Sequence, residues 1–159
     1  MDFAAIEATV RAVQADFDRI NGLLADRRDP MGEAVVANLM AGYRFVDRLV
    51  AGGVDLFALG NLKHLLELNT LVLCGTDEQA RREAAPHLEA SERRFYEQDE
   101  GGIRDIVEWY ALHQVESVWQ RAAGVYIRVL SEPQLFIEGN HRTGALIMSY
   151  ILLREGRPP

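Results

Sequence analysis

Cysteine is almost missing from this sequence, since Cys74 is the only one among 159 residues. A single cysteine excludes an internal disulfide and a cysteine-rich metal site. It lies in the apolar run from Thr70 to Cys74, a setting that is typical of a core thiol rather than of a nucleophile. The sequence therefore predicts that Cys74 is buried.

Basic charge and long apolar runs are also scarce. The chain has 17 Lys and Arg residues against 24 Asp and Glu residues, which gives a formal net charge of −7. This balance lacks the basic footprint of a protein that wraps a nucleic-acid backbone, so we expect no nucleic-acid partner. No apolar run approaches the roughly 18 residues of a membrane span, and the N-terminus begins acidic and amphipathic. We therefore expect no membrane partner and a cytoplasmic location.

Alternating strand patterns and internal repeats are lacking as well, whereas helical periodicity runs along most of the chain. The length and the 48% hydrophobic content fit one domain that spans residues 1–159. The predicted fold is all-α, a single helical domain of about six to eight helices with room for one short β-hairpin. The expected helices cover residues 3–24, a segment from Asp29-Pro30 to a stop at Gly52-Gly53, residues 56–74, 103–112 and 115–130, and a last apolar helix around 146–153.

Local signals refine these helices. Asp2 and Asp55 are predicted N-caps, and Gly75 is a predicted helix end. Residues 76–79 have the form of a capping box that opens a short polar helix, which Pro86 interrupts or restarts. The charged segment 91–102 ends in paired glycines and has the weakest pattern. The aromatic residues at helical spacing are expected in the core; they are Trp109, Trp119 and Tyr126.

A polar loop followed by an apolar helix is the part of the sequence that suggests chemistry. Gly139 allows successive N–H groups to point the same way, and the helix that follows adds partial positive charge, so the two form a predicted anion site. Asn140 and Arg142 can bind phosphate oxygens, and Glu138 can hold Mg²⁺. The alternative is that Gly139 only makes a turn, Asn140 caps the last helix and Arg142 pairs with a surface acid.

These residues resemble the core of a known signature. The run Phe136-x-Glu138-Gly139-Asn140-x-Arg142-Thr143-Gly144 is similar to the Fic/Doc family motif H-x-F-x-(D/E)-(G/A)-N-x-R. Residues 121–130 resemble the helix that precedes the signature in that family. The resemblance implies a helical domain that transfers AMP, or another phosphate-containing group in some branches, from a nucleotide such as ATP to a hydroxyl of a target protein.

The resemblance also implies roles for individual residues. Glu138 would be the Mg²⁺ ligand, and Asn140 and Arg142 would contact phosphate. The N–H groups of Gly139, Asn140, His141 and Arg142 would form the anion hole, with Phe136 as a buried anchor of the loop. A flap that aligns the target protein beside the nucleotide would correspond to residues 91–102.

Gln134 is the main departure from the family pattern, because it stands where the family has its catalytic histidine. A carboxamide is too weak a base to take a proton from the target hydroxyl. Losing a general base costs about 10² to 10⁴ in rate, so we expect a nucleotidyl (AMP) transferase with impaired or altered activity, or a pseudoenzyme. His141 is a second candidate for the base because histidine titrates near neutral pH. Alternatively, it only offers its backbone N–H and points to solvent.

Ala145 is a second departure, because many AMP-transferring members have a further arginine there. A small residue at this position resembles the Doc branch, and thus a toxin-antitoxin-related protein. The family's inhibitory helix pattern is incomplete, since Glu155-Gly156 matches its end but Ile151 replaces the hydroxyl residue. The remaining alternative is a non-catalytic helical module that binds a partner protein.

Overall fold

The all-α prediction is confirmed by a computed structural model, which describes residues 1–25, 27 and 30–159. No strand occurs among these residues, so the optional hairpin is not found. The described elements are α1 (Phe3–Ala15), α2 (Phe17–Gly22), α3 (Glu33–Ala51), the 3-10 helix η1 (Leu59–Asn61), α4 (Lys63–Cys74), α5 (Glu78–Glu83), α6 (Ala85–Glu97), α7 (Ile103–Leu112), α8 (Val118–Leu130) and α9 (Asn140–Arg154).

Some predicted helices divide or begin later than expected. The segment 3–24 divides at Asp16, whose N–H still bonds to the Ala12 carbonyl at 3.3 Å as the C-cap of α1. Pro86 lies in the first turn of α6, where its missing N–H removes no helical hydrogen bond, so it restarts a helix rather than ending one. The helix expected from residue 56 begins at Lys63 because a turn and η1 precede it.

The predicted caps have mixed outcomes. The Asp2 carboxylate accepts a hydrogen bond from the Ala5 N–H, and Gly75 ends α4 at a φ of 62°, as expected. Asp55 caps a turn instead of a helix, since its Oδ1 accepts from the Phe57 N–H at 3.0 Å. The N-cap of α5 is Asp77, the second residue of the predicted box. The expected cap at residue 29 lies outside the described residues.

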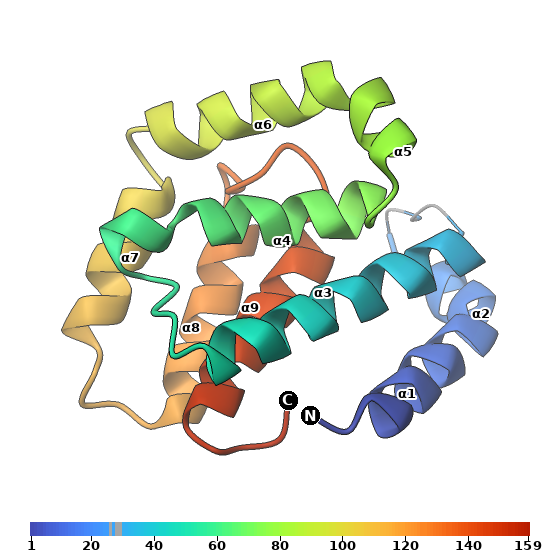
Figure 1. The fold of residues 1–159 in the computed structure, drawn as a ribbon, viewed down its shortest axis with the longest axis horizontal. Helices are drawn as coiled ribbons and strands as arrows, with labels where there is room; N and C mark the ends of the chain where they lie inside the picture. Colours follow the sequence, from blue (N-terminus) through green and yellow to red (C-terminus); the bar gives the residue numbers. More distant parts are fainter. Residues whose placement is uncertain (26, 28–29) are drawn as a thin grey trace.

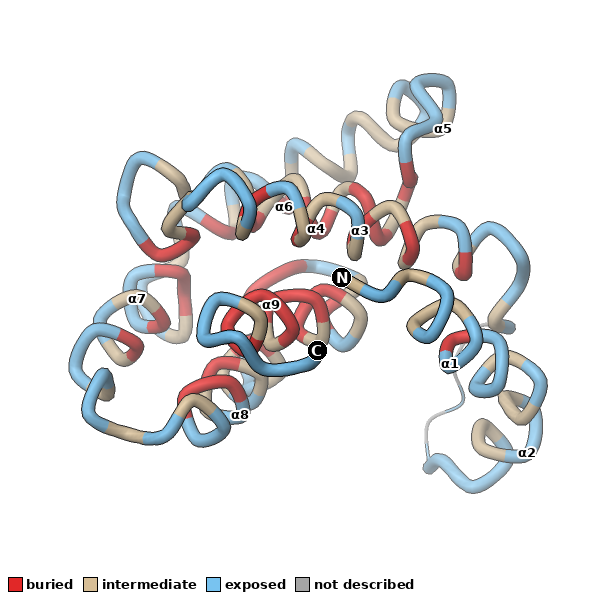
Figure 2. The backbone as a smooth tube through the Cα atoms, turned by 60° about the horizontal axis from the view of Figure 1, so that its bottom comes forward, coloured by how far each residue is buried: buried red, intermediate tan, exposed pale blue. Residues whose placement is uncertain are grey.

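α9 lies at the centre of the fold, with α8 beside it and α3 and α4 packed across it (Figure 1). Buried residues follow almost the whole length of α9, whereas α2 is pale blue and tan (Figure 2). Contact on several sides explains why the α9 sequence is apolar around much of its circumference. Cys74 is buried at 8% exposure and free, as predicted.

The prediction of a core aromatic is wrong for Trp119, which is 54% exposed. It lies near the start of α8, where the neighbouring helices do not cover it. Helical periodicity identifies a face of a helix, but it does not determine how far neighbouring elements extend over that face. Trp109 and Tyr126 are half-buried, and the Arg128 guanidinium lies 4.0 Å from the centroid of the Trp109 ring.

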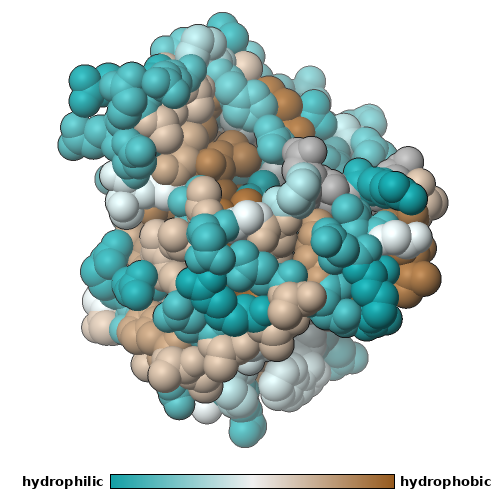
Figure 3. All heavy atoms as spheres, turned by 90° about the vertical axis from the view of Figure 1, so that its right-hand side faces the viewer, coloured by the Kyte–Doolittle hydropathy of each residue, from teal (hydrophilic) through white to brown (hydrophobic). Residues whose placement is uncertain are grey.

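The surface mixes hydrophilic and apolar residues, as Figure 3 shows for the side that carries α2 and α5. This mixture is usual, because a folded chain has too little polar surface to cover itself completely. Within residues 1–25, 27 and 30–159, no helix combines the length and the apolar content needed to cross a bilayer.

Candidate functional site

The loop of residues 131–139, here called the motif loop, joins α8 to α9 and lies between α4 and α6 (Figure 1). Two buried side chains anchor it, since Leu135 is 1% exposed and Phe136 is 0% exposed. The Phe136 ring stacks on Phe95 of α6, with centroids 5.6 Å apart and an interplanar angle of 14°. The apolar centre of the loop thus fixes the polar residues on either side of it.

Asn140 holds the loop in shape. Its side chain is 4% exposed, and its Oδ1 accepts from the Phe136 N–H at 2.8 Å. Its Nδ2 donates to the Phe136 carbonyl at 2.8 Å and to Gln134 Oε1 at 3.0 Å. The amide therefore satisfies both backbone groups of Phe136. Asn140 does not cap α9, because the N-cap position belongs to Gly139.

Gly139 makes the turn into α9 in the left-handed region, at a φ of 75°. A Cβ atom at this position would lie 3.1 Å from both Asn69 Nδ2 and Val72 Cγ1 of α4, closer than ordinary packing allows. Asn69 is itself buried at 2% exposure and donates to the Glu138 carbonyl at 2.9 Å and to Thr143 Oγ1 at 3.0 Å. α4 therefore determines the position of the turn.

The N-terminus of α9 has no side-chain cap, since Gly139 carries no acceptor. The first N–H groups of a helix have no acceptor within the helix, and the helix dipole adds positive charge there. An anion can satisfy these groups. The Arg142 Nη1 donates to the Val72 carbonyl at 3.3 Å, and His141 is exposed with its Nδ1 3.3 Å from the Tyr126 hydroxyl. Both side chains thus lie on the first turn of α9.

Glu138 is the acidic residue next to this helix end. Its side chain is 57% exposed, and its Oε2 lies 3.8 Å from His87 Nε2 of α6. No cluster of three or more His, Cys, Asp or Glu side chains suited to a metal occurs in the described part of the chain. A Mg²⁺ ion at this helix end would have Glu138 as its one carboxylate ligand from this part of the chain and would need phosphates and water for the others.

α6 covers the motif loop from the opposite side. Arg94 Nε donates to the Gln134 carbonyl at 2.8 Å, and Gln98 Nε2 donates to the Pro133 carbonyl at 3.4 Å. Residues 91–97, in the segment expected to form a flap, are helical instead, because Ser91 and Phe95 lie on one buried face of α6. The flap segment therefore contacts the loop as a helix followed by a turn.

The structure brings Gln134 and Asn140 into direct contact and places Glu138, Gly139 and Arg142 around one helix end. Sequence reasoning missed Asn69, His87 and Arg94, which hold the loop or lie beside it. Asn69 left a signal, since it is an amide within a helix that is otherwise apolar. His87 and Arg94 left none. The chain matches no protein-family model, no curated protein and no solved structure.

Proposed function

We propose that this chain is a Fic-like domain that binds a nucleotide or another phosphate compound with Mg²⁺ at the N-terminus of α9. The observation that carries the proposal is the uncapped start of α9 behind the left-handed Gly139, with Glu138 and Arg142 beside it. Phosphate oxygens at this position would accept from the N–H groups of residues 139–142. The exposed His141 and the guanidinium of Arg142 add donors at the same helix end.

Glu138 is the residue that would hold Mg²⁺, because its carboxylate is more than half exposed beside the proposed phosphate site. The bound ion would neutralise phosphate charge. Asn140 would support the phosphate site indirectly and not by a direct contact with phosphate. Its amide is engaged with the backbone of Phe136, so its role here is to position the loop.

The proposed domain would transfer a nucleotide fragment to a target protein poorly or in an altered way, because Gln134 replaces a general base. The Gln134 Oε1 accepts a hydrogen bond from Asn140 Nδ2, and a carboxamide oxygen does not take up a proton near neutral pH. A target hydroxyl bound here would lack a general base at that position, at a cost of about 10² to 10⁴ in rate. Nucleotide binding does not need that base.

Calorimetry with ATP, ADP and AMP in the presence of Mg²⁺ tests the binding site. We expect wild type to bind at least one of them and Arg142→Ala to bind it at least about tenfold more weakly, because a charge-assisted hydrogen bond is lost. Arg93→Ala is the matched control, since Arg93 is an exposed arginine of α6. Equal binding by wild type and Arg142→Ala, or no binding by either protein, would remove the phosphate site.

A non-catalytic module that binds a partner protein is the second candidate. It is favoured by the hydrogen bond from Asn140 Nδ2 to Gln134 Oε1, which engages two polar side chains of the motif with each other. The two functions differ in the transfer of label from radioactive ATP to protein in a lysate. A labelled band that disappears in Glu138→Ala would exclude the binding module, whereas the module predicts no labelled band with either protein.

A further inference from the structure

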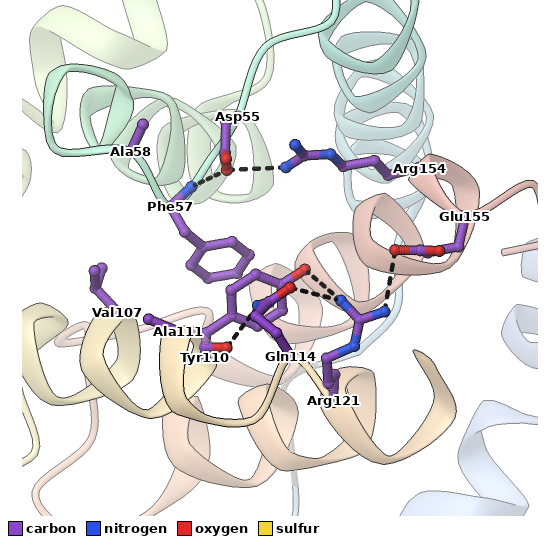
Figure 4. A pocket seen from close by; sticks show the side chains of 10 residues that line it. All are labelled: Asp55, Phe57, Ala58, Val107, Tyr110, Ala111, Gln114, Arg121, Arg154 and Glu155. Atoms are coloured by element: carbon purple, nitrogen blue, oxygen red, sulfur yellow. Dashed lines mark hydrogen bonds and ion pairs between the residues drawn. The ribbon is translucent and has the colours of Figure 1, made fainter. Parts of the chain in front are cut away.

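A pocket lies at the C-terminal end of α9, away from the motif loop. It has a volume of about 340 Å³ and is formed by the turn before η1, by α7, by the start of α8 and by the C-terminal end of α9 (Figure 4). Arg154 and Glu155 line it, whereas the motif loop meets α9 at Asn140. With a rise of 1.5 Å per residue, α9 separates the two places by about 20 Å. The pocket is therefore independent of the proposed phosphate site.

One wall of this pocket contains a buried guanidinium that is poorly satisfied. Arg121 is 7% exposed, and its Nη2 donates to Glu155 Oε1 at 3.0 Å. Its Nη1 donates to the Tyr110 hydroxyl and to Gln114 Oε1, both at 3.3 Å, which is longer than a usual N–H···O hydrogen bond. Its Nε is buried without a hydrogen-bond partner in the described structure. The buried charge of Arg121 therefore needs an anionic partner at Nη2, the position that the Glu155 carboxylate occupies.

A second arginine, Arg154, lines the same pocket. Arg154 Nη1 forms an ion pair with Asp55 Oδ1 at 2.9 Å and donates to the Tyr150 hydroxyl at 3.3 Å. The hydrogen bond to Asp55 raises the pKa of Arg154, which keeps this group charged. Figure 4 shows both arginines with their acidic partners on the same side of the pocket.

The opposite wall is apolar and aromatic. The rings of Phe57 and Tyr110 stack with centroids 4.0 Å apart and an interplanar angle of 23°. Ala58, Val107 and Ala111 extend this surface (Figure 4). A pocket of a few hundred Å³ with an apolar wall and a few polar groups at one side is the usual form of a small-molecule site.

We propose that this pocket binds a small molecule with one carboxylate on an apolar body. The carboxylate would lie at Arg121 and Arg154, and the body would lie against Phe57 and Tyr110. Glu155 already places a carboxylate on Arg121, and its side chain is 48% exposed, so it can turn to solvent and leave that position to the ligand. Guanidinium groups bind planar carboxylates with paired hydrogen bonds.

The charge of the pocket favours a monoanion over a phosphate. Asp55 and Glu155 cancel the charges of the two arginines, so the pocket has no excess positive charge to hold a dianion. When Glu155 turns to solvent, its negative charge leaves Arg121. A bound monoanion replaces that one charge, so the net charge around the two arginines stays the same.

A matched set of probes tests the proposal with the full chain. In calorimetry or protein-observed NMR titration, 3-phenylpropanoate should bind at least about tenfold more tightly than 3-phenylpropan-1-ol or 3-phenylpropylamine, which lack the carboxylate. Saturable binding should occur below about 10 mM, and inorganic phosphate should not compete. Phenylalanine distinguishes a zwitterionic ligand from a simple acid, and tighter binding of phenylalanine would still support the carboxylate contact.

The variants have expected effects of opposite sign. Glu155→Gln removes the internal competitor and should tighten binding of 3-phenylpropanoate several-fold, whereas Arg154→Gln and Arg121→Gln should weaken it about tenfold or more. Arg93→Gln should leave it unchanged. Glu155 and Arg154 are partly exposed, so their variants test the site even where Arg121→Gln does not fold. The proposal is overturned by equal binding of acid and alcohol, by effective competition from phosphate, or by a Glu155→Gln variant that binds no more tightly than wild type.

Discussion

Asn140→Ala should destabilise the protein in the absence of any ligand. The substitution removes the acceptor of the Phe136 N–H and the donor to the Phe136 carbonyl, each a 2.8 Å hydrogen bond. Phe136 is 0% exposed, so both backbone groups would be left in a place that water reaches poorly. The third bond, to Gln134, matters less because Gln134 is half-buried and can turn to solvent.

The size of the effect follows from these two backbone groups. An orphaned buried donor or acceptor costs about 1 to 3 kcal/mol, and some water entering the loop would relieve part of this cost. We therefore expect a loss of about 2 to 4 kcal/mol in the free energy of unfolding. For a chain of this length, each kcal/mol lowers Tm by about 2 to 4 °C, which gives a decrease of roughly 4 to 16 °C.

Equilibrium unfolding in urea, followed by far-UV circular dichroism, measures this loss when the m-value is unchanged. Asn61→Ala is the control, because the Asn61 amide makes one hydrogen bond, to the Asp55 carbonyl at 2.8 Å, and should cost about 0.5 to 1.5 kcal/mol. If the stability of Asn140→Ala without ligand lies within about 0.5 kcal/mol of wild type, Asn140 does not hold the loop. Its amide would then be available for phosphate.

Three further predictions concern the same region of the molecule. Gln134→His should raise the labelling of protein from ATP by about 10² to 10⁴, because it restores a general base. The labelling should increase as the pH rises through about 6.5 and should require Glu138. If the variant binds nucleotide but labels no protein, Gln134 is not the main defect. Gly139→Ala should lower the free energy of unfolding by about 1 to 3 kcal/mol, because its φ is 75° and the added Cβ would lie 3.1 Å from Asn69 and Val72. Equilibrium unfolding in urea measures this loss, and an unchanged urea midpoint would contradict the prediction. Burial raises the pKa of the Cys74 thiol, so the unfolded chain ionises first and stability should fall as the pH rises above about 8.5. Cys74→Ala should flatten that slope, and an equal slope in both proteins would show that other groups cause it.

The helices of this protein follow from local sequence, because a helix depends on residues within three or four positions of each other. The apolar stripe, the Asp2 cap and the Gly75 stop predict their elements without knowledge of the partners. The turn at Gly139 ahead of the last helix also follows from local sequence. The resemblance to a phosphate-binding motif rests on nine adjacent residues, 136–144, and so could be seen in the sequence alone.

Only the tertiary structure decided what surrounds that motif. Asn69 bonds to Thr143 across 74 positions of the chain, and Arg94 bonds to Gln134 across 40. The helical state of residues 91–97 depends on the burial of Phe95 against Phe136, and the exposure of Trp119 depends on where neighbouring helices end. The pocket at Arg121 likewise joins residues from the turn before η1, α7, α8 and α9. Such contacts leave no periodic signal in the sequence, because they depend on how whole helices pack and not on the spacing of residues within one of them.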